Sequence, residues 1–246
     1  MLTFLKYSLL AGVFSFQALA FDEVKLNSAI EMDDLTTVQK IIESGEATVD
    51  QKIQAEPYGP NTPIVALAGR AAALKVLKYL IENKADLNAR TRLEETALML
   101  AAFFEDEDGQ MQPGYVRHEK AVQMLVEAGA EVENLPNKYT ALSYAAYQGH
   151  DRIVLYLLKN GANPDGGIAN GKVEVNTPLM MSSINGNLES TLWLLRHGAD
   201  AKIVNAKGKT ALMLAKQFAQ KKMIPFLMCA ELLQEGETFS KKCEKQ

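Results

Sequence analysis

The chain has 246 residues, and its 26 basic and 30 acidic side chains give a formal net charge of −4. This mildly acidic balance excludes the polycationic surface of a nucleic-acid-binding protein. The hydrophobic share of 48% is that of a folded protein, and the length is near the upper end for one compact core but ordinary for a stack of repeats.

Residues 1–20 are expected to form a cleavable signal peptide. Lys6 supplies positive charge near the start, residues 7–16 form an uncharged, largely apolar run, and Ala-Leu-Ala at 18–20 offers the small residues of a cleavage site. A short membrane anchor is the alternative, but the apolar run falls short of the roughly 20 residues that span a bilayer. We therefore expect an exported protein that does not insert into a membrane after cleavage.

Residues 21–228 are expected to form a repeat domain, because one phrase recurs at steps of 33 to 44 residues. The phrase is Thr, then Pro or Ala, then Leu or Ile; Thr can cap a helix, and Pro or Ala fits its first turn. In the clearest copy, residues 140–165, a helix with small buried residues is followed by a Gly-His break, a second helix with an apolar stripe and a helix-ending Gly. Neither helix can bury its face alone, so neighbouring copies must stack. The copies begin near residue 24 and at Thr62, Thr96, Thr140, Thr177 and Thr210.

The copies are not uniform along the chain. The first, residues 26–46, is degenerate, and the connections at 46–61 and 162–176 are longer than a tight hairpin needs. The third carries roughly a dozen extra residues between its helices, within residues 105–120, and these include four consecutive acidic side chains. Because long loops on a rigid scaffold often carry function, these irregular places are candidates for binding.

These residues resemble the ankyrin-repeat family over nearly all of the chain after residue 20. The family pattern T-P-L-H-x-A-A-x-x-G-H, followed by V-x-x-L-L-x-x-G-A, is matched best by residues 140–165. The resemblance implies an all-α solenoid of about six helix-turn-helix repeats joined by β-hairpin-like loops. The family's usual His after T-P-L is absent, which puts its hydrogen-bond ladder in doubt. The residues that replace it are Val65, Met99, Ser143, Met180 and Met213.

The tail, residues 229–246, holds both cysteines, Cys229 and Cys243. In a reducing cytosol the two would be inert or unrelated, whereas in an exported protein an even pair indicates a disulfide. A bridge between them would close a loop of about 15 residues and contribute on the order of 3 kcal/mol in the chain-entropy model. Two cysteines with no His nearby do not make a zinc site.

No pattern for catalysis stands out. The three histidines, His118, His150 and His197, each fall where repeat geometry explains them, and none has a metal-binding spacing. The sequence has neither a nucleophile elbow nor a phosphate-binding loop, and the acidic run at 105–108 lacks the alternating ligands of a calcium loop. We therefore expect a protein that is not an enzyme, with no cofactor and no metal.

A binding surface is expected where the family binds, on the hairpin tips and the concave face of the first helices. The exposed first-helix positions fall seven and eight residues after each Thr, and four of these ten are aromatic although aromatics make up 7% of the chain. Aromatic side chains beside polar neighbours are typical of protein-binding hot spots. The alternative is that insertion loops cover them, above all Phe103 and Phe104. The candidate residues are Arg92, Leu93, Phe103, Phe104, Pro136, Tyr139, Tyr147, Ile184, Asn185, Lys207 and Phe218.

The combination of a signal peptide, ankyrin repeats and no active site resembles small exported bacterial ankyrin proteins. Some of these resemble immunity factors of predatory bacteria, which bind peptidoglycan DD-endopeptidases in the producer's own periplasm. The resemblance implies a periplasmic protein, monomeric when free, whose partner is a peptidoglycan hydrolase that it restrains. Two alternatives remain open: a helper that stabilises a periplasmic antioxidant enzyme, and an ankyrin effector secreted into another cell.

Overall fold

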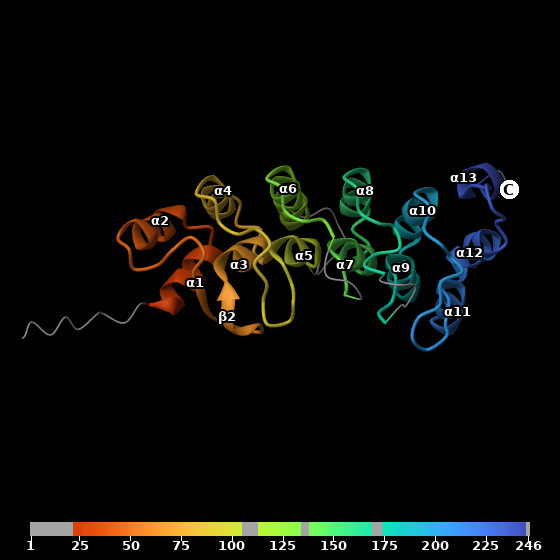
Figure 1. Ribbon diagram of the computed structural model, residues 1–246, viewed down its shortest axis with the longest axis horizontal. Coiled ribbons are helices and arrows are strands. Elements are labelled where there is room, and N and C mark those ends of the chain that lie inside the picture. The colour runs from red at the N-terminus through yellow and green to blue at the C-terminus, as the bar shows by residue number, and fades with distance from the viewer. Residues whose placement is uncertain (1–21, 105–112, 134–137, 169–173, 245–246) are drawn as a thin grey trace, which may run out of the picture.

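The computed structural model describes residues 22–104, 113–133, 138–168 and 174–244. The expected signal peptide, the acidic run at 105–108 and Pro136 lie outside the described residues. The chain forms a row of helix pairs that runs from α1 at one end to α13 near the C-terminus at the other (Figure 1). The expected all-α ankyrin solenoid is confirmed.

Each pair has a first helix and a second helix, and the pairs follow one another along the chain. The first helices are α1 (Glu23–Glu31), α3 (Ile64–Arg70), α5 (Ala97–Ala102), α7 (Ala141–Gln148), α9 (Pro178–Asn185) and α11 (Ala211–Gln217). The second helices are α2 (Leu35–Glu43), α4 (Leu74–Glu82), α6 (Pro113–Glu127), α8 (Asp151–Lys159), α10 (Leu188–Arg196) and α12 (Ile224–Glu231), the last preceded by the short η1 (Lys221–Met223). A final helix, α13, spans Phe239–Lys242.

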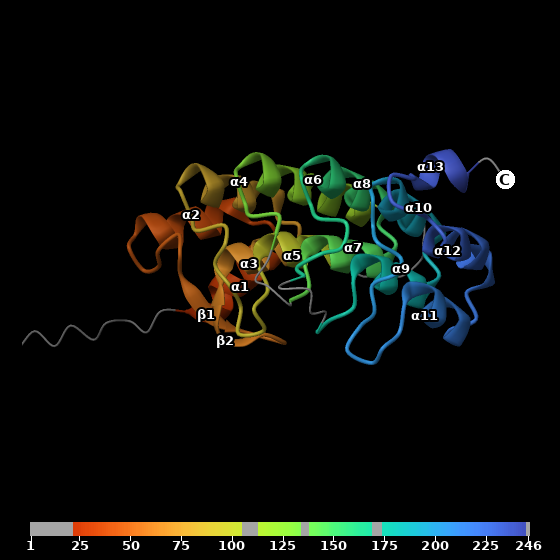
Figure 2. The same ribbon diagram turned by 45° about the vertical axis from the view of Figure 1, so that its right-hand side comes forward.

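The helices form two layers, with consecutive first helices packed against one another and consecutive second helices up to α10 packed above them (Figures 1 and 2). The core lies between the layers and is filled by completely buried side chains such as Leu98, Leu142 and Ile153. Burying one such side chain contributes about 1.5–3 kcal/mol, and each first helix packs against the first helix of the next pair. Stability therefore comes from stacking rather than from single repeats.

One regular sheet lies among the described residues, a hairpin in the first long connection. Strand β1 (Lys52–Ala55) runs antiparallel to β2 (Gly59–Pro63), with Ile53 opposite Thr62. Because Thr62 belongs to this strand, its hydroxyl donates to the Gly59 carbonyl at 2.9 Å, and α3 is preceded by Pro63 without a side-chain cap. The expectation that every repeated Thr caps a helix is therefore wrong at this copy.

The other four copies follow the expected capping. The hydroxyls of Thr96, Thr140, Thr177 and Thr210 each accept the backbone N–H three residues further on, at 3.2–3.3 Å. At Thr140 the two residues form a complete capping box, because the Ser143 hydroxyl also accepts a hydrogen bond from the Thr140 N–H. A cap of this kind contributes about 1 kcal/mol, so the phrase has a physical role in starting each helix.

Successive repeats are joined by a series of hydrogen bonds from side chains to backbone carbonyls, which we call the ladder. It stands in place of the hydrogen bonds expected from the family's His after T-P-L. The residue ten places after the capping Thr is His150, Asn187 or Gln220, and its side chain reaches the end of the preceding first helix. His150 Nε2 lies 2.9 Å from the Phe104 carbonyl oxygen, Asn187 Nδ2 donates to the Tyr147 carbonyl at 2.7 Å, and Gln220 Nε2 donates to the Ile184 carbonyl at 3.1 Å. The last carbonyls of a helix have no partner within it, so these side chains satisfy groups that burial would otherwise penalise.

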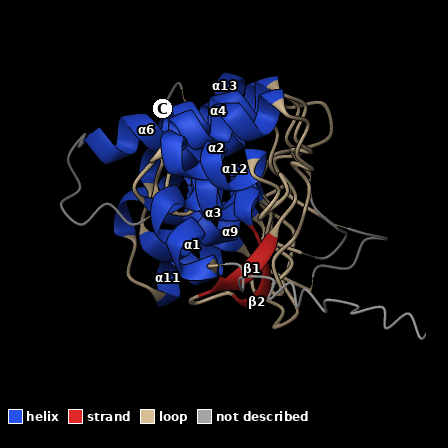
Figure 3. Cartoon of the chain, turned by 90° about the vertical axis from the view of Figure 1, so that its left-hand side faces the viewer, coloured by secondary structure: helices blue, strands red, loops and turns tan. Residues whose placement is uncertain are grey.

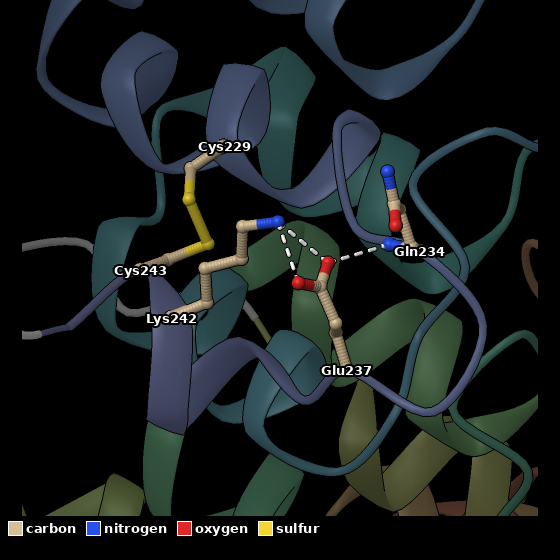
Figure 4. Close-up of a disulfide and its surroundings, with 5 residues drawn as sticks. All are labelled: Cys229, Gln234, Glu237, Lys242 and Cys243. Carbon is tan, nitrogen blue, oxygen red and sulfur yellow. Dashed lines mark hydrogen bonds and ion pairs between the residues drawn. A yellow bond between two sulfur atoms is a disulfide. The ribbon is translucent and has the colours of Figure 1, made fainter.

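The C-terminal end is closed by a disulfide between Cys229 and Cys243 (Figure 4). Between the two cysteines, the Glu237 carboxylate accepts from Lys242 Nζ at 2.6 and 2.7 Å and from the Gln234 N–H at 2.7 Å, and these bonds lower the pKa of Glu237. Cys229 lies inside α12, so the expected boundary after residue 228 cuts a continuous helix. The tail is part of the last repeat, because the disulfide fastens α13 to that helix.

Candidate protein-binding surface

The described candidate residues other than Phe104 lie where the first helices meet the loops on one side of the molecule. An end-on view shows these loops gathered together on that side, with β1 and β2 among them (Figure 3). We call this side the concave face. It carries two hollows, one near each end of the stack, which we call the N-terminal hollow and the C-terminal groove.

The N-terminal hollow has a volume of about 600 Å³ and is lined by side chains of the first three repeats. The Arg70 guanidinium lies 5.6 Å from the centre of the Tyr58 ring, a cation–π arrangement that holds the cation at the edge of the hollow. Phe103, which ends α5, is half-buried and lines the same hollow. An aromatic floor with a cation at its edge suits an amphipathic side chain of a partner.

Aromatic side chains continue from this hollow towards the middle of the stack. The Phe103 and Tyr144 rings have centroids 4.8 Å apart, and Tyr139 lies 6.1 Å from Tyr144. The Tyr144 hydroxyl donates to Glu95 Oε1 at 2.9 Å, which ties α7 to the loop before α5. Burial raises the pKa of Glu95, although hydrogen bonds from Tyr144 and Thr91 partly offset this. Burial and the neighbouring Glu95 also raise the pKa of Tyr144, so that hydroxyl remains a donor at neutral pH.

The C-terminal groove has a volume of about 320 Å³ and lies between the last long loop and helices α9 and α11. Four sequence-predicted residues line it together: Tyr139, Ile184, Lys207 and Phe218. The Phe218 side chain is 46% exposed, which is unusual for so large an apolar residue. The groove thus gathers residues that are up to 79 positions apart in the sequence.

Phe104 is mostly buried, although it also lines the N-terminal hollow, so it offers little surface to a partner. It is only 9% exposed, and its ring is stacked between His118 and His150, with ring centroids 4.1 and 3.8 Å away. Helix α5 ends at Ala102 with Phe103 as its C-cap, and the next side chain, Phe104, packs against His118 of α6 and His150 at the start of α8. Neighbouring second helices therefore cover it, and the alternative that these positions are core is correct for Phe104.

The histidine pair has a structural role in this packing. His118 Nδ1 lies 3.1 Å from the Ala101 carbonyl oxygen, and His150 is buried. Burial, with smaller contributions from the neighbouring His150 and Arg117, lowers the pKa of His118 to about 4, and the hydrogen bond to the Ala101 carbonyl only partly offsets this. The His118 ring is consequently uncharged at neutral pH, and both rings stack flat against the Phe104 ring. In the fifth repeat, His197 is the C-cap of α10, and its Nδ1 lies 2.8 Å from the Trp193 carbonyl oxygen in the last turn of that helix.

The remaining predicted residues are spread over the concave face. Arg92 and Leu93 form an exposed loop tip, with Leu93 61% exposed. Tyr147 is half-buried, and its carbonyl accepts the Asn185 side-chain N–H at 2.8 Å. Asn185 is therefore exposed but engaged in joining two repeats, which reduces its value as a contact residue.

Sequence reasoning missed three residues of this surface. Tyr144 lies one helical turn before Tyr147, so the spacing of three residues on α7 places both on one face and could have revealed it. Tyr58 and Asn176 stand in loops with no periodic pattern, and nothing in the sequence marks them. Asn176 Oδ1 accepts from the Asn205 side chain at 2.8 Å on the wall of the groove.

Within the described parts of the chain, no group of His, Cys, Asp or Glu side chains is arranged to hold a metal ion. No helix in the same parts is long and apolar enough to cross a membrane.

Comparison with known proteins gives ankyrin repeats over most of the chain. A family model described as ankyrin repeats (3 copies) matches residues 114–167 and 166–235, and one described as ankyrin repeats (many copies) matches residues 65–109. Neither model is that of a catalytic family. Ankyrin repeats are typically non-catalytic modules that bind other proteins, and the concave face is the surface available for it here.

Curated relatives share the repeats only. Ankyrin repeat and SOCS box protein 16 of Mus musculus is 38% identical over 112 residues, which is 45% of this chain and 23% of that protein. Ankyrin repeat and KH domain-containing protein mask-1 of Caenorhabditis elegans is 30% identical over 201 residues, which is 74% of this chain and 7% of that protein. This chain spans less than a quarter of either relative. Since the two family models together cover more than half of the chain, and its helix pairs stack as the models require, the protein belongs to the ankyrin-repeat family.

Proposed function

We propose that this protein is an exported, non-catalytic binding protein that holds and restrains a peptidoglycan endopeptidase in the periplasm of the cell that makes it. The observation that carries the binding role is the concave face, where aromatic side chains from separate repeats line two hollows. Folding leaves Phe218 46% exposed there, although burying it within the protein would be favourable.

The size of the concave face suits a protein partner. A standard interface buries about 800 Å² on each partner, which requires some 20–30 residues. The two hollows and the loop tips between them extend from the first repeat to the sixth, so a folded partner can contact several repeats at once. Aromatic anchors in hollows with polar rims are the arrangement that concentrates binding energy.

Export is supported by the signal-peptide pattern at residues 1–20 and by the disulfide. Cys229 and Cys243 are bonded and fasten α13 to α12. Structural disulfides persist in oxidising compartments such as the periplasm and are rare in the cytosol. A tail that depends on this bond is suited to a protein that works outside the cytoplasm.

The choice of a cell-wall endopeptidase as the partner rests on the resemblance to exported bacterial ankyrin proteins described above. A stack of repeats without catalytic groups can restrain a hydrolase by covering its substrate cleft. Restraint then requires tight contact and no chemistry from the ankyrin protein itself. The proposal thus predicts a stable complex whose formation removes hydrolase activity.

The test measures release of peptides from purified peptidoglycan by periplasmic DD-endopeptidases, with increasing amounts of the exported, processed protein. We expect activity to fall to background at saturation. The Tyr147→Ala, Phe218→Ala variant should lose inhibition while keeping its helical circular dichroism signal.

The matched control is Val116→Ala, Leu232→Ala. These side chains are 54% and 72% exposed on α6 and at the end of α12, outside the two hollows. Undiminished hydrolysis at saturating wild-type protein would overturn the choice of partner. Equal inhibition by both double variants would overturn the choice of surface.

A further inference from the structure

The sixth repeat has a charge opposite to that of the whole chain. Between Ala201 and Ala230 the sequence contains six lysines and no Asp or Glu, whereas the complete chain has a net charge of −4. Lys207, Lys216 and Lys222 are exposed and take part in no ion pair within the described residues. A local positive field of this kind attracts carboxylates and repels basic partners.

The same repeat also leaves large apolar side chains exposed. Met213 is 52% exposed, whereas Met99 and Met180, which occupy the same place in earlier repeats, are 4% and 1% exposed. The difference arises because α11 is the last first helix and no further repeat packs on it among the described residues. Phe218 at the end of α11 is likewise uncovered.

These two features meet in the C-terminal groove. Lys207 and Lys209 stand on the loop that forms one wall, while Ile184 and Phe218 come from the helices opposite. Lys209 Nζ bonds the Gln217 side chain, so its charge is held at the groove. Glu174 is the one acidic side chain among the described lining residues, which leaves the two lysines in excess.

We propose that the C-terminal groove binds an acidic segment of a partner protein that carries one large apolar side chain. The apolar side chain packs against Ile184 and Phe218, and the carboxylates on either side of it meet Lys207 and Lys209. The Asn205 side chain bonds Asn176 Oδ1 and accepts the backbone N–H groups of Lys207 and Lys209, so it holds the lysine-bearing loop in place at the groove. This inference rests on the proposed protein-binding function and names the chemistry of what is bound.

The shape of the groove favours a protein segment over other acidic surfaces. A membrane offers a broad, flat layer of charge, whereas the lysines here border a hollow of about 320 Å³ with an aromatic wall. A hollow of that size accepts a side chain and a few residues of backbone.

The test uses an array of random-sequence peptides probed with the full, processed protein. We expect the strongest binders to be rich in Asp and Glu around one aromatic or large aliphatic residue. Binding of the best peptide, measured in solution by fluorescence anisotropy, should weaken at least about tenfold with Lys207→Glu, Lys209→Glu and to a similar extent with Phe218→Ala. It should also weaken as salt is raised.

Matched controls keep the total charge and the apolar loss constant. Lys40→Glu, Lys159→Glu makes the same charge change on the exposed sides of α2 and α8, and Leu232→Ala removes an exposed side chain outside the groove. Both control variants should bind the peptide as the wild type does.

Several results would overturn the inference. These are enrichment of basic or neutral peptides, absence of any binder, and peptide binding that the groove variants leave unchanged. Attachment to phosphatidylglycerol vesicles without peptide enrichment would assign the groove to membranes, and a dimer abolished by Lys207→Glu, Lys209→Glu would assign it to a second copy. If the protein inhibits the hydrolase but does not prefer acidic peptides, the proposed function stands and this inference fails. If it prefers acidic peptides but does not inhibit the hydrolase, this inference stands and the hydrolase is not the partner.

Discussion

The third and sixth repeats both have a phenylalanine eight residues after the capping Thr, but one of these side chains is buried and the other is exposed. Phe104 is 9% exposed and stacked between two histidines, whereas Phe218 is 46% exposed and lines the C-terminal groove. The residue type and its place in the repeat are identical, so neither determines burial. Burial depends on the neighbours: His118 on α6 and His150, the residue just before α8, pack against Phe104. Phe218 has no following repeat to supply such a cover among the described residues.

The largest expected effect comes from truncating each phenylalanine in turn. Phe104→Ala should lower the free energy of unfolding by about 3–5 kcal/mol, because it leaves a cavity between two fixed rings. Phe218→Ala should cost less than about 1 kcal/mol, since its side chain is largely in water already. Urea unfolding followed by circular dichroism measures both. Equal losses would contradict the different environments described for the two residues.

The disulfide should matter next, and mainly at the sixth repeat. Cys229 and Cys243 are 14 residues apart, so replacing both by Ser should cost on the order of 3 kcal/mol by the loop-entropy model. Because each repeat contacts mainly its neighbours, the loss should appear as local opening of α12 and α13. Hydrogen exchange can locate it, with Phe104 and its surroundings as the internal control. Uniform loss of protection along the chain would contradict a local clip.

Acid should weaken the packing around Phe104. The pKa of His118 is lowered to about 4 in the folded protein from an ordinary 6.5. Between these two pH values the unfolded chain binds a proton at His118 and the folded protein does not. The contribution of His118 to stability is therefore fully present above pH 6.5 and is lost as the pH falls towards 4, by on the order of 3 kcal/mol. The difference between wild type and His118→Asn, measured by urea unfolding at several pH values, isolates this contribution from the carboxyl groups. A difference that does not vary with pH would contradict a neutral, buried His118.

The smallest effect concerns the ladder that joins repeats five and six. Gln220→Ala leaves the Ile184 carbonyl without its 3.1 Å donor and should cost about 1 kcal/mol. Gln234→Ala is the control, because its side chain is exposed and only its backbone N–H is used. Matching unfolding midpoints for the two variants would mean that the ladder does not hold the last repeat in place.

The fold was largely predictable from local pattern. The capping Thr, the helical spacing of Leu and Ala, and the glycines that end second helices each act within one repeat. Gly129, Gly161 and Gly198 have φ values of +91°, +90° and +91°, as the helix-ending role requires. The exception at Thr62 arises because the long first connection forms a hairpin, and that depends on strand pairing rather than on the phrase itself.

The binding surface was less predictable, because exposure depends on contacts between repeats. Tyr144 could have been found from its helical spacing to Tyr147. The burial of Phe104 could not, since it requires His118 and His150 to arrive from two different helices. The C-terminal groove likewise exists only when a loop and two helices meet.

The central claim is that a partner protein binds at the C-terminal groove. Its most direct test is photo-crosslinking in the cell that produces the protein. A photoreactive phenylalanine analogue would replace Phe218 in one strain and Leu232 in another, since both side chains are exposed but only Phe218 lines the groove. We predict a defined protein adduct from position 218 and none from position 232. No adduct at 218, or the same adducts at both positions, would contradict the account.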